Sequence, residues 1–129
     1  MIREYKFDVH NEMYVSIPEE KEKVCLILSD SLEVINEELT LPYKVKLDNL
    51  LDQSSVWYPT ALEKIQEEFP ELAHARLLSI FILSEQTDID LIFGLEFGLR
   101  EDSEHGRGLK FSLNSLEILE YGLGEVAYY

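Results

Sequence analysis

The residues best suited to chemistry lie in one polar segment, residues 100–108, between two expected strands. Asp102, Glu104 and His105 are all competent ligands for a divalent cation, and a loop can bring such side chains together. No second histidine lies near this segment, and the one thiol, Cys25, is distant in the sequence, so the ligand set of a metal site is incomplete. We therefore expect a solvated hairpin loop that binds no metal or cofactor and whose glycines permit unusual backbone angles.

Other catalytic arrangements find less support. The cysteine lies within an apolar run, where a thiol behaves as a small hydrophobic residue, ionises poorly and is expected in the core. His10 and His74 have no partner that sequence spacing can identify. An acid-base pair could be chosen from Asp88, Asp90 and Glu96, but a chain with 26 acidic residues always offers some such pair. We expect no enzymatic activity.

The aromatic pair Trp57 and Tyr58 offers a different kind of site. The pair stands at an expected helix junction, where aromatic side chains can anchor a protein partner. Burial beneath the helices is the alternative, and it is the commoner outcome for large aromatic residues. The sequence leaves both possibilities open.

The whole chain is acidic. Its 129 residues include 26 Asp and Glu against 11 Lys and Arg, which gives a formal net charge of -15 at pH 7. Binding to nucleic acids or anionic membranes needs clustered basic side chains, so both classes are disfavoured and the natural macromolecular partner is basic. A single cysteine cannot form an internal disulfide, and no apolar run approaches the roughly 20 residues that cross a bilayer, so the cytoplasm is the expected compartment.

The elements that position these residues fall into three groups within one expected domain, residues 1–129. In the first group, alternation of apolar and polar residues predicts strands over 5–9 and 13–17, joined by a turn at 10–12. A short apolar run predicts a third strand over 24–28. The N-terminal third is therefore expected to contribute three strands.

The middle of the chain has helical spacing instead. Apolar residues recur every three or four positions over 43–51 and again after Pro59, which predicts two helices separated by the 53–58 segment. Thr60 fits the N-cap of the second helix, in competition with two serines upstream, and Pro70 is expected to end that helix.

The last third returns to strands. Residues 77–83 are apolar, residues 89–99 alternate strictly, and residues 109–113 and 116–121 follow after turns, which predicts a four-strand antiparallel meander. Strands and helices that are segregated in sequence favour an α+β fold, here an antiparallel sheet with the two central helices packed on one face.

The C-terminal third also resembles a known family. An Asp-x-Glu-His-Gly-x-Gly pattern precedes an apolar strand, a short turn, a second strand and a closing glycine with a small-residue-aromatic end. The order is similar to that of immunity proteins from bacterial polymorphic toxin and contact-dependent growth inhibition systems. The segments that carry the likeness are 91–94, 102–111, 120–122 and 126–128. The resemblance implies an inhibitor of a cognate toxin domain, with no enzymatic activity and with a structural role for the motif.

The resemblance also suggests where a toxin would be held. Many such toxins are nucleases with basic substrate grooves, which carboxylates can occupy in place of phosphates. Asp88 and Asp90 lie near one end of an expected strand, and Glu101, Asp102 and Glu104 lie near its other end. Either cluster is a candidate for binding the active site of a toxin or an adjacent exosite.

Two other function classes stay open. One is a small acidic adaptor or structural protein with an unrelated protein partner. The other is a metal-dependent enzyme that uses the 100–108 loop.

Overall fold

A six-stranded mixed sheet organises the chain in the computed structural model, which describes residues 2–129. The strands lie side by side in sequence order, and every neighbouring pair is antiparallel except β2 with β3. The strands are β1 (Glu12–Val15), β2 (Val24–Leu28), β3 (Ala75–Ile82), β4 (Ile92–Leu99), β5 (Arg107–Ser112) and β6 (Ile118–Gly122). The predicted antiparallel meander is confirmed as β3 to β6.

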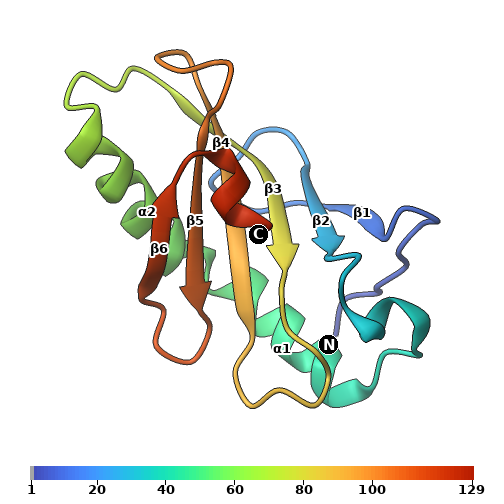
Figure 1. Cartoon of the computed structure of the whole chain (residues 1–129). Helices are drawn as coiled ribbons and strands as arrows, with labels where there is room; N and C mark the ends of the chain where they lie inside the picture. Colours follow the sequence, from blue (N-terminus) through green and yellow to red (C-terminus); the bar gives the residue numbers. More distant parts are fainter. Residues whose placement is uncertain (1) are drawn as a thin grey trace.

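The parallel pair corrects the expectation of a wholly antiparallel sheet. Between β2 and β3 the chain forms a 3-10 turn, η1 (Glu33–Asn36), and the two helices α1 (Leu41–Asp52) and α2 (Ser54–Glu68). Parallel neighbours need a crossover of a dozen or more residues, and this helical segment supplies it. The helices thus lie behind one face of the sheet, as predicted (Figure 1). Among residues 2–129, neither helix combines the length and the apolar character needed to cross a bilayer.

The N-terminal segment is not the strand that its alternation predicted. Residues 2–8 have no regular structure, and β1 begins at Glu12, after a turn in which Asn11 has a φ of 62°. The alternation still identified the buried side, because Tyr5 and Phe7 pack against the core. The Tyr5 hydroxyl donates to Asp48 of α1, so side chains attach this segment to the helix instead of pairing it with the sheet.

The helix junction is shorter than predicted. Only Gln53 separates α1 from α2, so Pro59 and Thr60 lie inside α2 and Thr60 does not cap it. The Trp57 indole donates to the carbonyl oxygen of Leu50 at 2.8 Å, which satisfies an acceptor near the end of α1. This buried bond holds the two helices together at a point where the proline suggested a boundary. The predicted end of α2 before Pro70 is confirmed.

The core lies between the helices and the inner face of the sheet. Four alternate residues of β4 are buried there: Phe93, Leu95, Phe97 and Leu99. The ring of Trp57 meets Phe93 edge-on, with centroids 5.9 Å apart, and Tyr58 meets Phe97 in the same way at 5.7 Å. Edge-to-face pairs at these separations are favourable beyond the apolar area they bury.

The outer face of the sheet is covered only in part. A second 3-10 turn, η2 (Gly124–Ala127), crosses it on the side opposite to the helices (Figure 1). A Cβ placed on Gly94 would lie 1.8 Å from the Ala127 oxygen, and one on Gly108 would lie 2.7 Å from the Gly124 oxygen. Glycines in β4 and β5 therefore allow the backbone of η2 to lie directly on the sheet.

Candidate functional site

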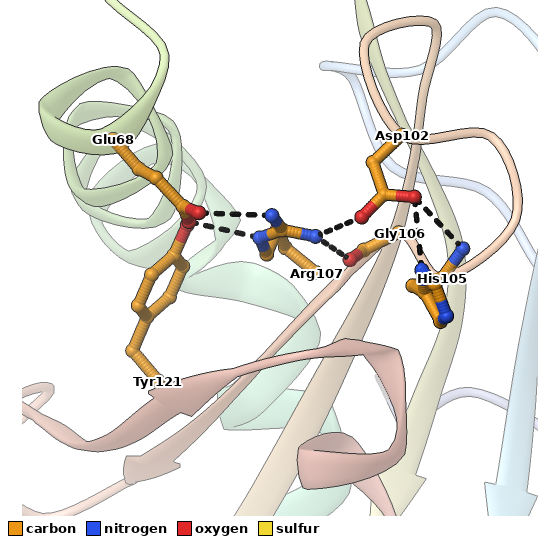
Figure 2. Close-up of polar contacts among 6 residues, drawn as sticks. All are labelled: Glu68, Asp102, His105, Gly106, Arg107 and Tyr121. Atoms are coloured by element: carbon orange, nitrogen blue, oxygen red, sulfur yellow. Dashed lines mark hydrogen bonds and ion pairs between the residues drawn. The ribbon is translucent and has the colours of Figure 1, made fainter.

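The polar loop singled out by the sequence is attached to α2 through Arg107 (Figure 2). The guanidinium donates to both carboxylate oxygens of Glu68, at 2.8 and 2.9 Å, and to Asp102 at 2.7 Å and the Gly106 carbonyl at 2.6 Å. The Tyr121 hydroxyl also donates to Glu68. The Arg107 side chain is only 8% exposed. One buried cation thus joins the loop, the end of α2 and β6.

Arg107 keeps both of its carboxylate partners ionised. Arg107 and the hydrogen bond from Tyr121 together lower the pKa of Glu68 to about 2. Arg107 also lowers the pKa of Asp102, and His105 adds to that effect. Both carboxylates are therefore ionised and paired at neutral pH, so neither is available to act as a general acid.

The loop does not assemble the candidate metal ligands. Asp102 faces Arg107, the His105 ring lies 3.1 Å from Asp102 itself, and Glu104 is exposed. Within residues 2–129, no group of three His, Cys, Asp or Glu side chains is arranged to hold a metal ion. The segment is thus a structural clamp and not simply a solvated hairpin.

The two glycines of the motif have different roles. Gly106 has a φ of 62°, the unusual backbone angle expected of it, and a Cβ there would lie 2.3 Å from the Phe97 carbonyl oxygen. Gly108 was expected to provide a similar angle, but it lies within β5 and instead provides space for η2.

The two predicted acidic clusters lie at opposite ends of β4. Several of their carboxylates already accept hydrogen bonds within the chain. Asp88 accepts the Glu85 amide at 2.7 Å, and Asp90 accepts the Asn114 amide at 3.0 Å and the Ser112 hydroxyl. These bonds shape loops, as Asp side chains commonly do. In the second cluster, Glu101 accepts the Ala73 amide at 3.1 Å, while Asp102 belongs to the clamp.

Glu104 is the one carboxylate of the two clusters that has no partner among residues 2–129. Its side chain is exposed and forms no hydrogen bond or ion pair with the described residues 2–129. It is therefore the member with the clearest freedom to meet a partner.

Trp57 and Tyr58 are not available to a partner, which corrects their proposal as surface anchors. Trp57 is 0% exposed and Tyr58 is 8% exposed. The Tyr58 hydroxyl donates to Glu20 at 2.6 Å, so even its polar end is occupied within the chain. Burial beneath the helix pair, the alternative reading, is confirmed.

Cys25 also lies elsewhere than expected. Its side chain is half-buried on the outer face of β2, not in the core, and its sulfur lies 3.6 Å from a Glu12 oxygen. Burial and the neighbouring Glu12 raise the pKa of the thiol to about 11. The expectation that its ionisation is suppressed is therefore correct, although its location is not.

The open part of the outer face is the site that sequence reasoning missed. Strand pairing places Tyr14 beside Cys25, and Ile27 beside Phe81, on the part of the sheet that η2 does not cover. Tyr14 is 64% exposed. Tyr128, which follows η2 and is 44% exposed, brings its ring centroid 5.1 Å from that of Phe81. These side chains form an apolar surface across β1, β2 and β3, here called the outer apolar face.

Tyr128 separates two hollows on this side of the molecule. The first, of about 400 Å³, has Ile27 and Phe81 in its lining; its polar lining residues include His10, Glu12, Ser29 and Asp30. The second, of about 200 Å³, is mainly acidic; its lining residues are Glu96, Glu104, His105, Leu123, Gly124, Glu125 and Tyr128. A hollow of mixed polar and apolar lining and a hollow with three glutamates thus share Tyr128 as a wall.

Glu96 supplies the most buried carboxylate of the acidic hollow. It lies on a central strand opposite Ser79 of β3 and forms no ion pair with any Lys or Arg of residues 2–129. Burial raises the pKa of Glu96, and a hydrogen bond from Ser79 offsets part of that shift. A cation entering the hollow would therefore stabilise its ionised form.

The sequence contained a signal for this face. The alternation in β4 that buries Phe93 and Phe97 also places Gly94, Glu96 and Gly98 together on the opposite side. Isolated glycines within a strand often mark the close approach of another backbone.

The chain matches no family model, no curated protein and no solved structure.

Proposed function

We propose that this protein is an immunity-type inhibitor that binds and neutralises a basic toxin domain, such as a nuclease domain, and has no catalytic role of its own. One observation carries the proposal. The chain has 15 more acidic than basic side chains, and exposed carboxylates such as Glu104 are left free on a rigid sheet scaffold. Such a surface complements a substrate groove that is built to hold phosphates.

The same negative charge would let the inhibitor bind the toxin domain rapidly. Opposite net charges steer two proteins together and raise the association rate well above that of neutral partners. Once bound, carboxylates would occupy the positions of substrate phosphates, at the active site of the toxin or at an adjacent exosite. The association rate should then fall steeply as salt screens the charges.

The test uses the C-terminal domain of any large secreted protein encoded beside the gene for this chain. That domain is expressed in bacteria from a repressed promoter, with and without this chain. We expect growth arrest by the domain alone, restored growth with the chain present, and a complex that co-elutes in size-exclusion chromatography. Growth arrest that persists although the chain is folded and abundant would contradict the proposed function.

A further inference from the structure

We propose that the outer apolar face, together with the acidic hollow beside Tyr128, is the docking surface for the partner. The occupant that it fits is a basic protein segment in which an apolar side chain stands next to an arginine. This inference rests on the proposed function for the partner's role, but the surface can be tested separately.

The first hollow offers a place for an apolar side chain of the partner. Ile27 and Phe81 are half-buried in the outer face, and Tyr14 and Tyr128 are more exposed still. η2 lies over β4 and β5, and Figure 1 shows no helix of residues 2–129 over β1 and β2 on the same side. A hollow of about 400 Å³ accommodates one large apolar side chain. Interface anchors are typically such side chains inserted into pockets.

The second hollow offers carboxylates to a basic side chain of the partner. Glu96, Glu104 and Glu125 line it, and among residues 2–129 none of the three forms an ion pair with Lys or Arg. Lys110, in a neighbouring hollow that also contains Tyr128, already donates to Glu120 and to the Tyr129 carbonyl. The chain therefore leaves these carboxylates for an outside cation.

Arginine fits this position better than lysine. Its planar guanidinium binds a carboxylate through two hydrogen bonds and also stacks on an aromatic ring. Tyr128 lines the acidic hollow, and its ring lies beside that of Tyr129, with centroids 5.7 Å apart. An arginine in the hollow would thus meet glutamate carboxylates and an aromatic wall.

Charge also decides against a second copy of this chain as the occupant. Two copies would each bring a net charge of -15 and the same acidic rim to the contact. Like charges facing each other disfavour association. A basic partner gains from the same rim.

The first experiment uses the toxin domain as the probe and compares two matched double variants. Glu104→Gln with Glu125→Gln neutralises the docking surface, whereas Glu63→Gln with Glu71→Gln removes the same charge from exposed positions on α2 and just beyond it. We expect the first variant to weaken binding by about tenfold or more and the control by less than about twofold, and Tyr128→Ser to weaken it like the first variant. Equal affinities for parent, docking-surface and control variants would overturn the assigned surface while leaving the proposed function intact.

The second experiment does not need the toxin. The ¹⁵N-labelled chain is titrated with acetyl-Gly-Arg-Trp-Arg-Gly-amide and with the peptide in which serine replaces tryptophan. We expect the largest amide shifts in β2, β3 and residues 124–128, with a weaker response to the serine peptide. Shifts that centre on α1 and α2, or no shift at all, would overturn the surface. Localised shifts in a chain that fails to restore growth would support the surface and contradict the proposed function.

Sedimentation of the parent chain tests the remaining occupant. We expect a monomer across the accessible concentration range. A dimer that Tyr128→Ser dissociates would assign the face to a second copy and overturn the basic partner.

Discussion

The two faces of the sheet differ in what their side chains do, although they share the same strands. On the inner face, β4 presents Phe93 and Phe97 to the helices, and both are completely buried. On the outer face, the same strand presents Gly94, Glu96 and Gly98. The inner face stabilises the fold through side-chain volume, whereas the outer face accommodates a backbone and leaves an apolar surface open. One alternating strand thus presents bulky side chains to the core on one face and small or acidic side chains on the other.

The largest effect should come from the inner face. Phe93→Ala removes a fully buried ring that packs on Trp57 and Phe111, so we expect a loss of about 3–5 kcal/mol in the free energy of unfolding. Phe81→Ala is the matched change on the outer face, where the ring is half-buried, and should cost clearly less. Chemical denaturation measures both. Equal losses would mean that the two faces do not differ as described.

The second-largest loss in the free energy of unfolding should come from breaking the polar clamp on the inner face. Arg107→Met leaves Asp102 without its cation and removes a guanidinium that lies 4.8 Å from the centroid of the Phe69 ring. Loss of one partner from a buried pair costs about 3–5 kcal/mol, and the partly exposed carboxylates reduce this to about 2–4 kcal/mol. Denaturation at neutral pH gives the value. An unchanged denaturation midpoint for Arg107→Met would show that the clamp does not stabilise the fold.

The same variant has a defined pH dependence. The folded-state pKa of Glu68, about 2, lies below its ordinary value of 4.5, so its ionised form stabilises the fold above that ordinary value. This contribution is lost as the pH falls from 4.5 towards 2. The difference in thermal midpoint between parent and Arg107→Met should therefore narrow over this range. A difference that stays constant with pH would show that the ion pair does not supply it.

A smaller effect should come from filling space on the outer face. Gly94→Ala places a methyl group 1.8 Å from the Ala127 oxygen, so η2 must move away, at about 1–3 kcal/mol. Gly98→Ala is the control, because its methyl group meets only the flexible Leu78 side chain at 3.3 Å. Hydrogen exchange should show loss of protection in η2 for the first variant alone. Similar protection in both variants would contradict the packing role of Gly94.

The smallest effect should come from the exposed aromatic residue of the outer apolar face. Tyr14→Ser should change the free energy of unfolding by no more than about 0.5 kcal/mol, because the ring is largely in solvent. Tyr43→Ser provides the contrast, since Tyr43 is buried and donates to the Ser84 carbonyl at 2.8 Å. Thermal unfolding of both variants compares an exposed tyrosine of the outer apolar face with a buried tyrosine of α1. A large loss for Tyr14→Ser would mean that the outer apolar face is part of the core.

Local patterns in the sequence predicted local structure well. Alternation placed Phe93 and Phe97 correctly, and helical spacing found both helices. Pro59 misled because it lies inside α2, which continues through it although a proline there removes one backbone hydrogen bond.

What depends on distant residues could not be predicted from spacing. Arg107 meets Glu68, 39 positions earlier in the chain, so the sequence predicted a solvated hairpin loop where the structure has a clamp. The parallel pairing of β2 with β3 was hidden for the same reason. The outer apolar face depends on strand order across the whole sheet, whereas the glycines of β4 and β5 indicated only where another backbone lies on the sheet.

The parallel pairing of β2 with β3 has a consequence for folding kinetics. The meander from β3 to β6 closes through short loops, whereas β2 reaches β3 only after residues 29–74 are ordered. Closing a long loop costs conformational entropy before the contacts between its ends can stabilise the chain. β1 and β2 are therefore expected to join the sheet last, although the ribosome makes them first. In stopped-flow measurements, destabilising changes in β4 should then slow folding, and those in β2 should mainly speed unfolding.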